Sequence, residues 1–537
     1  MEKGYLSLIL HAHLPFVRHP EHDPFLEESW FYEGITGTYI PLIKMLDGLL
    51  DEGVDFAFTI SFSPTLIAMM EDKLLNDRYK KRLAALVELS YKEIERTKHD
   101  RHLNRLARMY NDLFKGTLDI YEKKYHCRLL NAFKKFDSSG KLEIMVCAGT
   151  HCFLPNIEMY PQAVRAQVKL AVDTYKRVFG HQPQGMWLPE CGYYPGLDNI
   201  LKEFGIKFFV VDTHGVLFAQ PRPRFGVYNP YYCKSGVSVF GRDMETSKNV
   251  WSAIDGYPGD VNYREFYRDI GHELDYDYIR PYLNGDGTRV NTGIKYHKIT
   301  GRTEHKELYE PEAARGVVDR HAANFTFNRE KQVEYLSEKL GRKPIIIAPY
   351  DAELFGHWWF EGVDWLNLVI RKSCYDQSAF KLITPMQYLK LYDKFQVISP
   401  SFSSWGWKGY SEVWLDGSND WIYPHLHMMI ERMSELANSF LDARNDLEEA
   451  LNHLARELLL AQASDWPFMM KTGACSYYAS QRIKDHIDRF NFLYEMIKQN
   501  RIDMRWLKKR RAQYNLFPEV DYRVYKQSRK KAVDSES

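Results

Sequence analysis

The stretch Pro344-Ile-Ile-Ile-Ala-Pro-Tyr-Asp-Ala-Glu-Leu-Phe-Gly-His-Trp-Trp-Phe-Glu-Gly362 decides how the rest of the chain is interpreted. Its beginning, Pro344–Ile347, is a short apolar run rich in β-branched residues, which predicts a fully buried strand. Five residues would then follow the carboxyl end of that strand: Asp351, Glu353, His357, Trp358 and Trp359. Parallel sheets present catalytic groups at this end of their strands. A helix start capped by acidic residues is the simpler alternative for a single stretch.

The same pattern recurs earlier in the chain, which favours the catalytic interpretation. Four more predicted strands end in His, Asp or Glu: Tyr5–Leu10 before His11 and His13, Leu142–Val146 before His151, Gly185–Leu188 before Glu190, and Lys207–Val211 before Asp212 and His214. Helical patterns separate these strands. Alternating strands and helices predict a parallel sheet, and with it an active site at one end of a barrel.

Changes in pattern along the chain predict its domains. Leucines at helical spacing alternate with charged residues from 72 to 139, which predicts a helical insertion in a barrel formed by 1–71 and 140–397. Apolar residues at intervals of three and four predict a helical domain over 398–537, whose polar end, 526–537, is expected to fray. The region 221–310, rich in Tyr, Gly and Pro, is predicted to form long loops over the barrel mouth.

Composition excludes several classes of function. The net charge of +1 over 537 residues gives no support for nucleic acid or an anionic membrane as the main partner. No run approaches the roughly 18 apolar residues of a membrane span. Seven cysteines without framework spacing, and an N-terminus that lacks a cationic start or cleavage site, predict a cytoplasmic protein. The aromatic content of 15% fits either large aromatic cores or stacking surfaces for flat ligands.

Two carboxylates stand out as candidate catalytic groups. Glu190 and Asp351 each closely follow a predicted buried strand and lie beside aromatic residues. Cleavage of a glycosidic bond requires such a pair, in which one carboxylate attacks or stabilises the sugar carbon and the other protonates the leaving oxygen. Tryptophans such as Trp187, Trp358 and Trp405 would offer flat apolar faces to sugar rings. Capping of helices by the two acids is again the simpler alternative.

Two rival functions come from the same residues. A metal-dependent hydrolase would bind Zn²⁺ through side chains at the strand ends and use Glu190 as general base; its ligands would be His11, His13, His151, His214 and Asp351. A non-catalytic carbohydrate-binding module would explain the aromatic residues but not the buried acids. A serine or cysteine nucleophile has no support, because no Gly-X-Ser-X-Gly motif is present, and phosphate-binding glycine loops are absent as well.

The chain resembles glycoside hydrolase family 57, and within it the 1,4-α-glucan branching enzymes and closely related amylase-like proteins. The resemblance covers nearly the whole chain and rests on five blocks: His11-Ala-His-Leu-Pro15, Thr150-His-Cys-Phe-Leu-Pro155, Trp187-Leu-Pro-Glu-Cys-Gly-Tyr193, Tyr350-Asp-Ala-Glu-Leu-Phe-Gly-His-Trp-Trp359, and Ser404-Trp-Gly406 through Trp414 to Asp420-Trp421. It implies an α/β fold, an incomplete (β/α)7 barrel with a helical insertion and a C-terminal α-helical domain.

The resemblance also implies a mechanism. It makes Glu190 the nucleophile and Asp351 the general acid and then the base of a retaining reaction on α-1,4-glucans, with no metal and no other cofactor. Retention predicts that the two carboxyls lie about 5 to 5.5 Å apart. The implied substrate-binding residues are His11, His13, Trp30, His151, Asp212, His214, Arg242, Asp243, His357, Trp358, Trp405, Trp414, Asp465 and Trp466. The expected partner is a polymer such as amylose, glycogen or starch, and the protein is expected to be a monomer or weak homo-oligomer.

Branching is the predicted activity, with amylase-type hydrolysis and 4-α-glucanotransfer as the alternatives. Branching relatives use a long loop with a tyrosine to keep water from the intermediate, and exclusion of water is what transfer requires. The candidate segment in this chain, Val227–Gly236, has tyrosines and is short. His297 stands where some branching relatives carry a tryptophan. Both features keep the hydrolytic alternative open.

Overall fold

A sheet of nine strands lies at the centre of the protein. The computed structural model describes residues 2–23, 25–252, 256–283 and 287–527. The strand order is β6-β7-β5-β4-β3-β2-β1-β8, with β9 beside β1. The strands are β1 (Gly4–Ala12), β2 (Phe58–Phe62), β3 (Leu142–Cys147), β4 (Gly185–Trp187), β5 (Phe208–Val211), β6 (Tyr231–Tyr232), β7 (Ser238–Gly241), β8 (Ile345–Asp351) and β9 (Phe380–Leu382).

The main strands are parallel and curl into an incomplete barrel. Only β6 pairs antiparallel, with β7, among the ladders of the described sheet. The two sides of the barrel approach each other through backbone hydrogen bonds of 3.0 Å from Asp243 N to Ile347 O and from Ile345 N to Tyr228 O. The (β/α)7 barrel is therefore confirmed. In its register His11 lies opposite Asp351, which brings two predicted site residues to the same strand ends.

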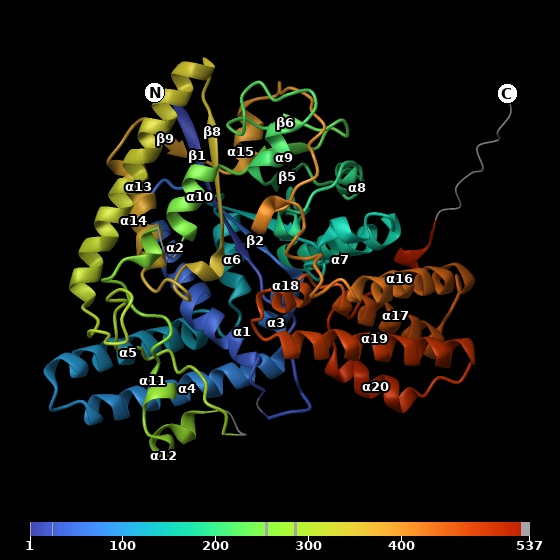
Figure 1. Ribbon diagram of the computed structural model, residues 1–537, viewed down its shortest axis with the longest axis horizontal. Helices are drawn as coiled ribbons and strands as arrows, with labels where there is room; N and C mark the ends of the chain where they lie inside the picture. Colours follow the sequence, from blue (N-terminus) through green and yellow to red (C-terminus); the bar gives the residue numbers. More distant parts are fainter. Residues whose placement is uncertain (1, 24, 253–255, 284–286, 528–537) are drawn as a thin grey trace.

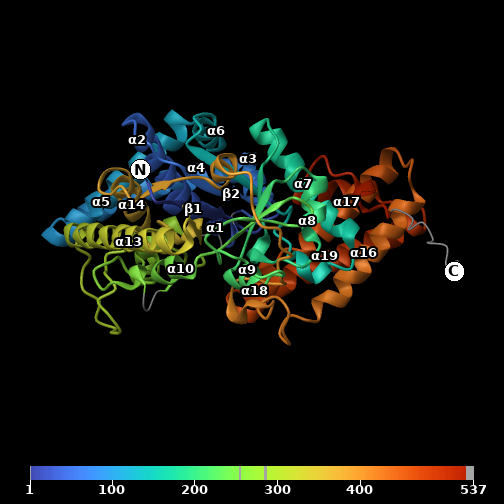
Figure 2. The ribbon, with the colours of Figure 1, turned by 90° about the horizontal axis from the view of Figure 1, so that it is seen from above.

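Helices cover both faces of the curled sheet, so the strands are buried (Figures 1 and 2). Those that follow the barrel strands are α1 (Glu28–Gly34), α2 (Ile40–Asp51), α3 (Pro64–Glu71), α7 (Pro161–Phe179), α8 (Leu197–Glu203), α9 (Thr213–Leu217), α10 (Met244–Trp251), α13 (Pro311–Leu340), α14 (Gly362–Tyr375) and α15 (Pro385–Leu391). Two short 3-10 turns, Pro189–Cys191 after β4 and Ala352–Leu354 after β8, carry residues of the candidate site.

The chain between α3 and β3 is helical, as the leucine pattern predicts. It forms α4 (Lys73–Arg96), α5 (Arg101–Leu118) and α6 (Leu130–Ser138). Asp72 begins α4 by accepting a hydrogen bond from Leu75 N at 3.0 Å, which satisfies one of the unpaired amides of the first turn. Helices α4 and α5 pack against each other beside the barrel (Figure 1). The exact boundaries of this insertion stay a proposal.

The middle region differs from the prediction. It contains the short helices α11 (Ile270–Glu273) and α12 (Tyr276–Ile279), and α12 lies against α4 instead of the barrel mouth. The hydroxyls of Tyr278 and Tyr282 donate to Glu93 and Glu88 of α4, at 2.7 and 2.8 Å. Tyr278 and Tyr282 of this region thus contact the insertion, and α10 lies against β8.

The C-terminal part is helical, as predicted. It contains α16 (Ile422–Ser439), α17 (Asn445–Ala461), α18 (Asp465–Thr472), α19 (Ser476–Lys498) and α20 (Met504–Gln513), which lie on the side of the barrel opposite α13 and α14 (Figures 1 and 2). The predicted frayed end falls, from residue 528 onward, outside the described residues. Among the described helices, none has the length and apolar character needed to cross a membrane.

Candidate active site

Glu190 lies at the carboxyl end of β4 and is held from two distant parts of the chain. Its backbone is left-handed, at φ 61° and ψ 22°, a conformation that is uncommon for residues other than glycine and that often marks functional positions. Trp405 Nε1 donates to Glu190 Oε2 at 2.6 Å, and Ser464 Oγ donates to Oε1 at 3.0 Å. The side chain is 13% exposed, so the carboxylate is oriented and still reachable.

Asp351 is the last residue of β8 and has a different environment. Within the described part of the chain, no hydrogen bond to its carboxyl is found. Burial holds the pKa of Asp351 well above its usual range, and the charges of Glu353 and Glu190 raise it further. The carboxyls of Glu190 and Asp351 are therefore close enough for their charges to interact. Their separation of about 5 to 5.5 Å stays a prediction.

The two environments separate the roles of the two acids. Burial raises the pKa of Glu190 to about 7, against the lowering effect of the Trp405 hydrogen bond. Asp351 lacks such donors, so its protonated form is favoured more strongly. Hydrogen bonds to a carboxylate favour its charged form, whereas burial favours the neutral one. Glu190 is therefore the better candidate for the ionised nucleophile and Asp351 for the protonated acid.

Replacing Trp405 by Phe is expected to move the acid limb of the pH profile to higher pH. The reaction needs ionised Glu190, so kcat/KM should fall below about pH 7 in the unaltered protein. Loss of the Trp405 donor removes a contact that favours the carboxylate and therefore raises the pKa of Glu190. The measurement is kcat/KM on maltoheptaose against pH, with Trp407→Phe, an exposed tryptophan of the same loop, as the control. A limb that stays in place or moves to lower pH would contradict this reasoning.

Three histidines form a stacked cluster beside Glu190. His11 Nε2 and His151 Nε2 share a hydrogen bond of 2.8 Å, and the rings of His13 and His151 stack with centroids 3.7 Å apart. The remaining ring nitrogens bond to side chains at 2.7 to 3.0 Å: His11 Nδ1 to Ser61, His13 Nδ1 to Ser63, His151 Nδ1 to Ser464, and His13 Nε2 to Asp465. Each of the six ring nitrogens thus has a partner within the protein.

Among the residues that the structure describes, two groups have a geometry that could hold a metal ion, and both belong to this cluster: His11 with Cys147 and His151, and His13 with His151 and Asp465. A metal ligand must offer a free lone pair from each histidine, and the hydrogen bonds of these rings compete for it. Dialysis against EDTA is therefore expected to leave turnover unchanged. A loss of turnover that added Zn²⁺ restores would favour the metal-dependent hydrolase instead.

Glu353 is a third acid of the site; the sequence placed it at this strand end but gave it no catalytic or binding role. Its Oε1 accepts a hydrogen bond from His13 N at 3.2 Å and another from the hydroxyl of Tyr39. Burial raises the pKa of Glu353 to about 7. Its position two residues after Asp351, at the same strand end, was the available signal. Tyr39 comes from a helical stretch whose sequence has no pattern pointing to the site, whereas Ser464 directly precedes the predicted residues Asp465 and Trp466.

Three predicted residues lie beside Trp405 and its loop: Asp212, His214 and Arg242. Arg242 Nη1 lies 3.2 Å from Asp212 Oδ2, and its guanidinium lies over the Trp405 ring, 5.5 Å from the centroid. His214 Nε2 bonds to Gly409 O at 2.8 Å, in the loop that follows Trp405. These predicted residues therefore join the site through the tryptophan that binds Glu190.

Three predicted binding residues are almost fully buried. Trp414 and Trp466 are each 1% exposed and Asp243 is 2% exposed. The Trp414 ring stacks on Phe153, while Asp243 begins α10 by accepting from Thr246 N at 2.8 Å. The contacts of these residues lie inside the fold, and their role in binding a glucan stays a proposal.

Three further aromatic residues lie apart from the two acids. Trp358 is 54% exposed and stacks on Phe266 at 4.4 Å, and the His357 ring meets Phe266 edge-on at 5.4 Å. Trp30 meets the edge of Tyr478 at 5.7 Å. Within the described residues, no contact joins these three side chains to Glu190 or Asp351. Their roles in binding a glucan stay proposals.

The segment Val227–Gly236 is not a loop over the site. Tyr231 is fully buried in β6 and donates its hydroxyl to Gly226 O at 2.8 Å, and Tyr232 packs against Phe395. The expectation that this segment corresponds to a water-excluding loop is therefore wrong. A different residue stands near the site: Trp251, 40% exposed at the end of α10, meets Trp405 at 6.0 Å.

Two interacting acids at the open end of a barrel are the arrangement that cleavage of glycosidic bonds requires. The sequence profile of Glycosyl hydrolase family 57 matches residues 7–339, and that of 1,4-alpha-glucan branching enzyme, C-terminal, matches residues 425–525. The chain therefore belongs to glycosyl hydrolase family 57, and it is an enzyme.

Individual relatives carry two different names. The chain is 32% identical, over 96% of its length, to 1,4-alpha-glucan branching enzyme TK1436 of Thermococcus kodakarensis and covers 78% of that protein. The structure of the alpha-amylase AmyC from Thermotoga maritima matches 98% of this chain and 100% of its own, with 42% identity and a TM-score of 0.92. A family 57 branching enzyme from Pyrococcus horikoshii matches 98% and 97%, with 31% identity and a TM-score of 0.86.

Proposed function

We propose that the protein is a retaining enzyme of α-1,4-glucans and that its main activity is that of a 1,4-α-glucan branching enzyme. The observation that carries the proposal is the pair of interacting acids, Glu190 and Asp351, on a chain whose residues 425–525 match the C-terminal profile of branching enzymes. Relatives that are named as branching enzymes, and that match along nearly the whole chain, support the choice of reaction.

In the first step the α-1,4 bond of the donor chain breaks. Asp351 gives its proton to the glycosidic oxygen, so the leaving chain departs as a neutral alcohol. A carboxylate oxygen of Glu190 attacks the anomeric carbon from the opposite side and forms a covalent β-glycosyl ester. The hydrogen bonds from Trp405 and Ser464 hold that carboxylate in one orientation for the attack.

In the second step the ester is passed to a glucan hydroxyl. Asp351, now ionised, takes the proton from a 6-hydroxyl, whose oxygen attacks the anomeric carbon and displaces Glu190. The new bond is α-1,6, and Asp351 is protonated again for the next cycle. Two inversions at the same carbon retain the α configuration, and the number of glycosidic bonds is unchanged.

Hydrolysis is the second candidate, and two observations favour it. The structure of AmyC, an alpha-amylase, matches 98% of this chain at 42% identity, and the segment Val227–Gly236 is packed into the sheet edge. If water reaches the ester before a 6-hydroxyl, the same two acids produce a reducing end. The choice between the reactions therefore depends on how well the site excludes water.

Proton NMR of amylose incubated with the enzyme tests the proposal. Growth of α-1,6 anomeric signals with few new reducing ends is the result expected of branching. Reducing ends that rise without α-1,6 signals would establish hydrolysis and contradict the main activity. New α-1,4 chain lengths with neither change would indicate 4-α-glucanotransfer.

Trp251→Ala is expected to raise the ratio of reducing ends to α-1,6 bonds. Trp251 is the exposed aromatic residue that meets Trp405, so its removal opens a path for water to the ester on Glu190. The two products are quantified by the same NMR and reducing-end assays, and Trp407→Ala provides a control with the same loss of aromatic volume. An unchanged ratio would show that Trp251 does not shield the intermediate.

A further inference from the structure

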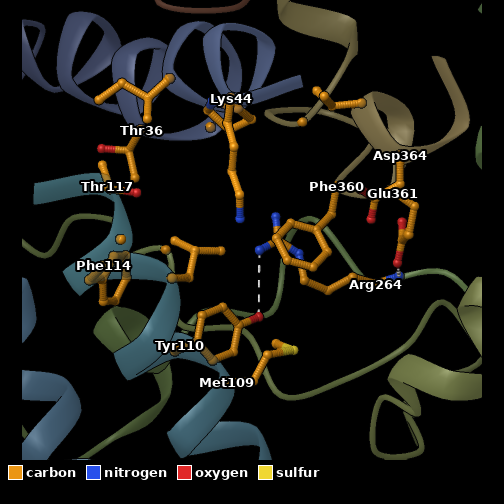
Figure 3. A pocket seen from close by; sticks show the side chains of 18 of the residues that line it. Thr36, Lys44, Met109, Tyr110, Phe114, Thr117, Arg264, Phe360, Glu361 and Asp364 are labelled. Atoms are coloured by element: carbon orange, nitrogen blue, oxygen red, sulfur yellow. Dashed lines mark hydrogen bonds between the residues drawn. The ribbon is translucent and has the colours of Figure 1, made fainter. Parts of the chain in front are cut away.

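A second cavity lies between the barrel and the helical insertion, away from the two acids. It has a volume of about 1200 Å³ and is lined by α2, α5, the start of α14 and the loop 291–295 (Figure 3). Neither Glu190 nor Asp351 lines it, whereas His357 does. The volume exceeds the roughly 300–1,000 Å³ of most small-molecule pockets, so an extended ligand fits better than a single small one.

One wall of this cavity carries a guanidinium group with few hydrogen-bond partners. Arg264 is 9% exposed, and its Nε is buried without a hydrogen-bond partner. Its Nη1 makes one long hydrogen bond, 3.5 Å, to the Tyr110 hydroxyl, and the group lies 3.9 Å from the centroid of Phe360. Buried polar groups are nearly always hydrogen-bonded, so donors left unused at a cavity wall indicate a ligand that accepts from them.

Lys44 points into the same space from the opposite wall. Figure 3 shows its side chain extending from α2 toward Arg264, with Thr36 and Thr117 beside it and Asp364 across the cavity. Among the described residues, Lys44 has no ion pair or hydrogen bond. Eight basic and six acidic side chains line the cavity, so its net charge is small for its size.

We infer that this cavity binds a segment of α-1,4-glucan as a second, non-catalytic site; the inference rests on the proposed function. Sugar hydroxyls both donate and accept, which suits a wall where Arg264 and Lys44 face acceptors such as Glu361 and Asp364. The partly exposed apolar side chains of Phe360, Met109 and Leu113 offer contacts to the CH groups of the sugar. A phosphorylated ligand would instead meet these two carboxyls.

The second site gives the enzyme a way to retain a polymer during repeated reactions. A chain held in the cavity stays near the cleft, so binding of another part of that chain at Glu190 becomes intramolecular. His357, which lines the cavity, follows Asp351 by six residues in the chain. Long glucans therefore gain more from this site than short ones do.

Binding of maltoheptaose to the Glu190→Gln protein tests the inference without turnover. Crystals soaked in maltoheptaose are expected to show sugar in both the cleft and the cavity, and calorimetry to show two sites. Arg264→Gln combined with Lys44→Gln should reduce the two sites to one and leave the cleft occupied. The exposed pair Lys81→Gln with Arg101→Gln, outside the lining, is the matched control and should keep two sites.

A variant at an exposed position guards against loss of the fold. Lys44→Trp fills the cavity without removing Arg264 and should likewise leave one site. Maltoheptaose in the cleft alone would overturn the inference, and so would inorganic phosphate that fills the cavity and displaces the sugar. Sugar in neither place would contradict the proposed function as well, so the two failures are distinguishable.

Discussion

Replacing Glu190 by Gln is expected to lower kcat by at least about 10⁴-fold, as loss of a nucleophile does in other enzymes with covalent intermediates. An amide cannot displace the glycosidic oxygen and form the ester. The fold should survive, because the amide oxygen can still accept from Trp405 Nε1, and the Ser464 hydroxyl can accept from the new NH₂ group. Turnover of amylose and thermal unfolding are the two measurements.

Glu143→Gln is the matched control for this change. Glu143 is also a half-buried glutamate on a barrel strand, and burial raises its pKa to about 7, but it accepts a hydrogen bond from Met386 N at 3.1 Å, away from the other acids. It should therefore leave kcat close to its original value. A Glu190→Gln protein that keeps a tenth or more of its turnover would remove Glu190 from the mechanism.

Replacing Asp351 by Ala is expected to lower kcat on amylose by about 10²- to 10⁴-fold, the usual contribution of a general acid and base. With a substrate that has a good leaving group, such as α-maltosyl fluoride, the rate of the first step should not fall, because fluoride leaves without a proton. The ester on Glu190 would then accumulate, since water or a sugar hydroxyl needs the missing base. The expected result is a burst of fluoride release followed by slow turnover.

Azide separates the roles of the two acids. In Asp351→Ala it needs no base and should attack the ester on Glu190 to form an α-glycosyl azide, with retained configuration. In Glu190→Ala it should take the place of the nucleophile and form the β-glycosyl azide. Anomeric proton signals distinguish the products. The opposite assignment of α and β products would exchange the roles of Glu190 and Asp351.

The strand ends were the part of the site that sequence could predict. Local sequence alone predicts the buried apolar strands and shows which residues follow their ends, among them His11, Glu190 and Asp351. The parallel order of the strands then brings these ends together, as the pairing of His11 with Asp351 shows. The barrel and its helices could be predicted for the same reason, because the alternation of strands and helices is also a local pattern in the sequence.

The residues that sequence could not place depend on contacts between distant segments. Nothing local distinguishes Trp405, which binds Glu190, from Trp414, which is buried against Phe153. Ser464 reaches Glu190 only because the helical domain packs on the barrel. The tyrosines in and after α12 were equally ambiguous, because a tyrosine-rich sequence fits a loop at the barrel mouth as well as a segment that packs on α4.

Mass spectrometry of the trapped intermediate tests the central claim, that Glu190 carries the sugar, most directly. Asp351→Ala protein is incubated briefly with α-maltosyl fluoride, denatured in acid and digested. The expected result is one maltosyl group on the peptide that contains Glu190. A maltosyl group on Glu353 or Asp465, or fluoride release without any labelled peptide, would contradict the claim.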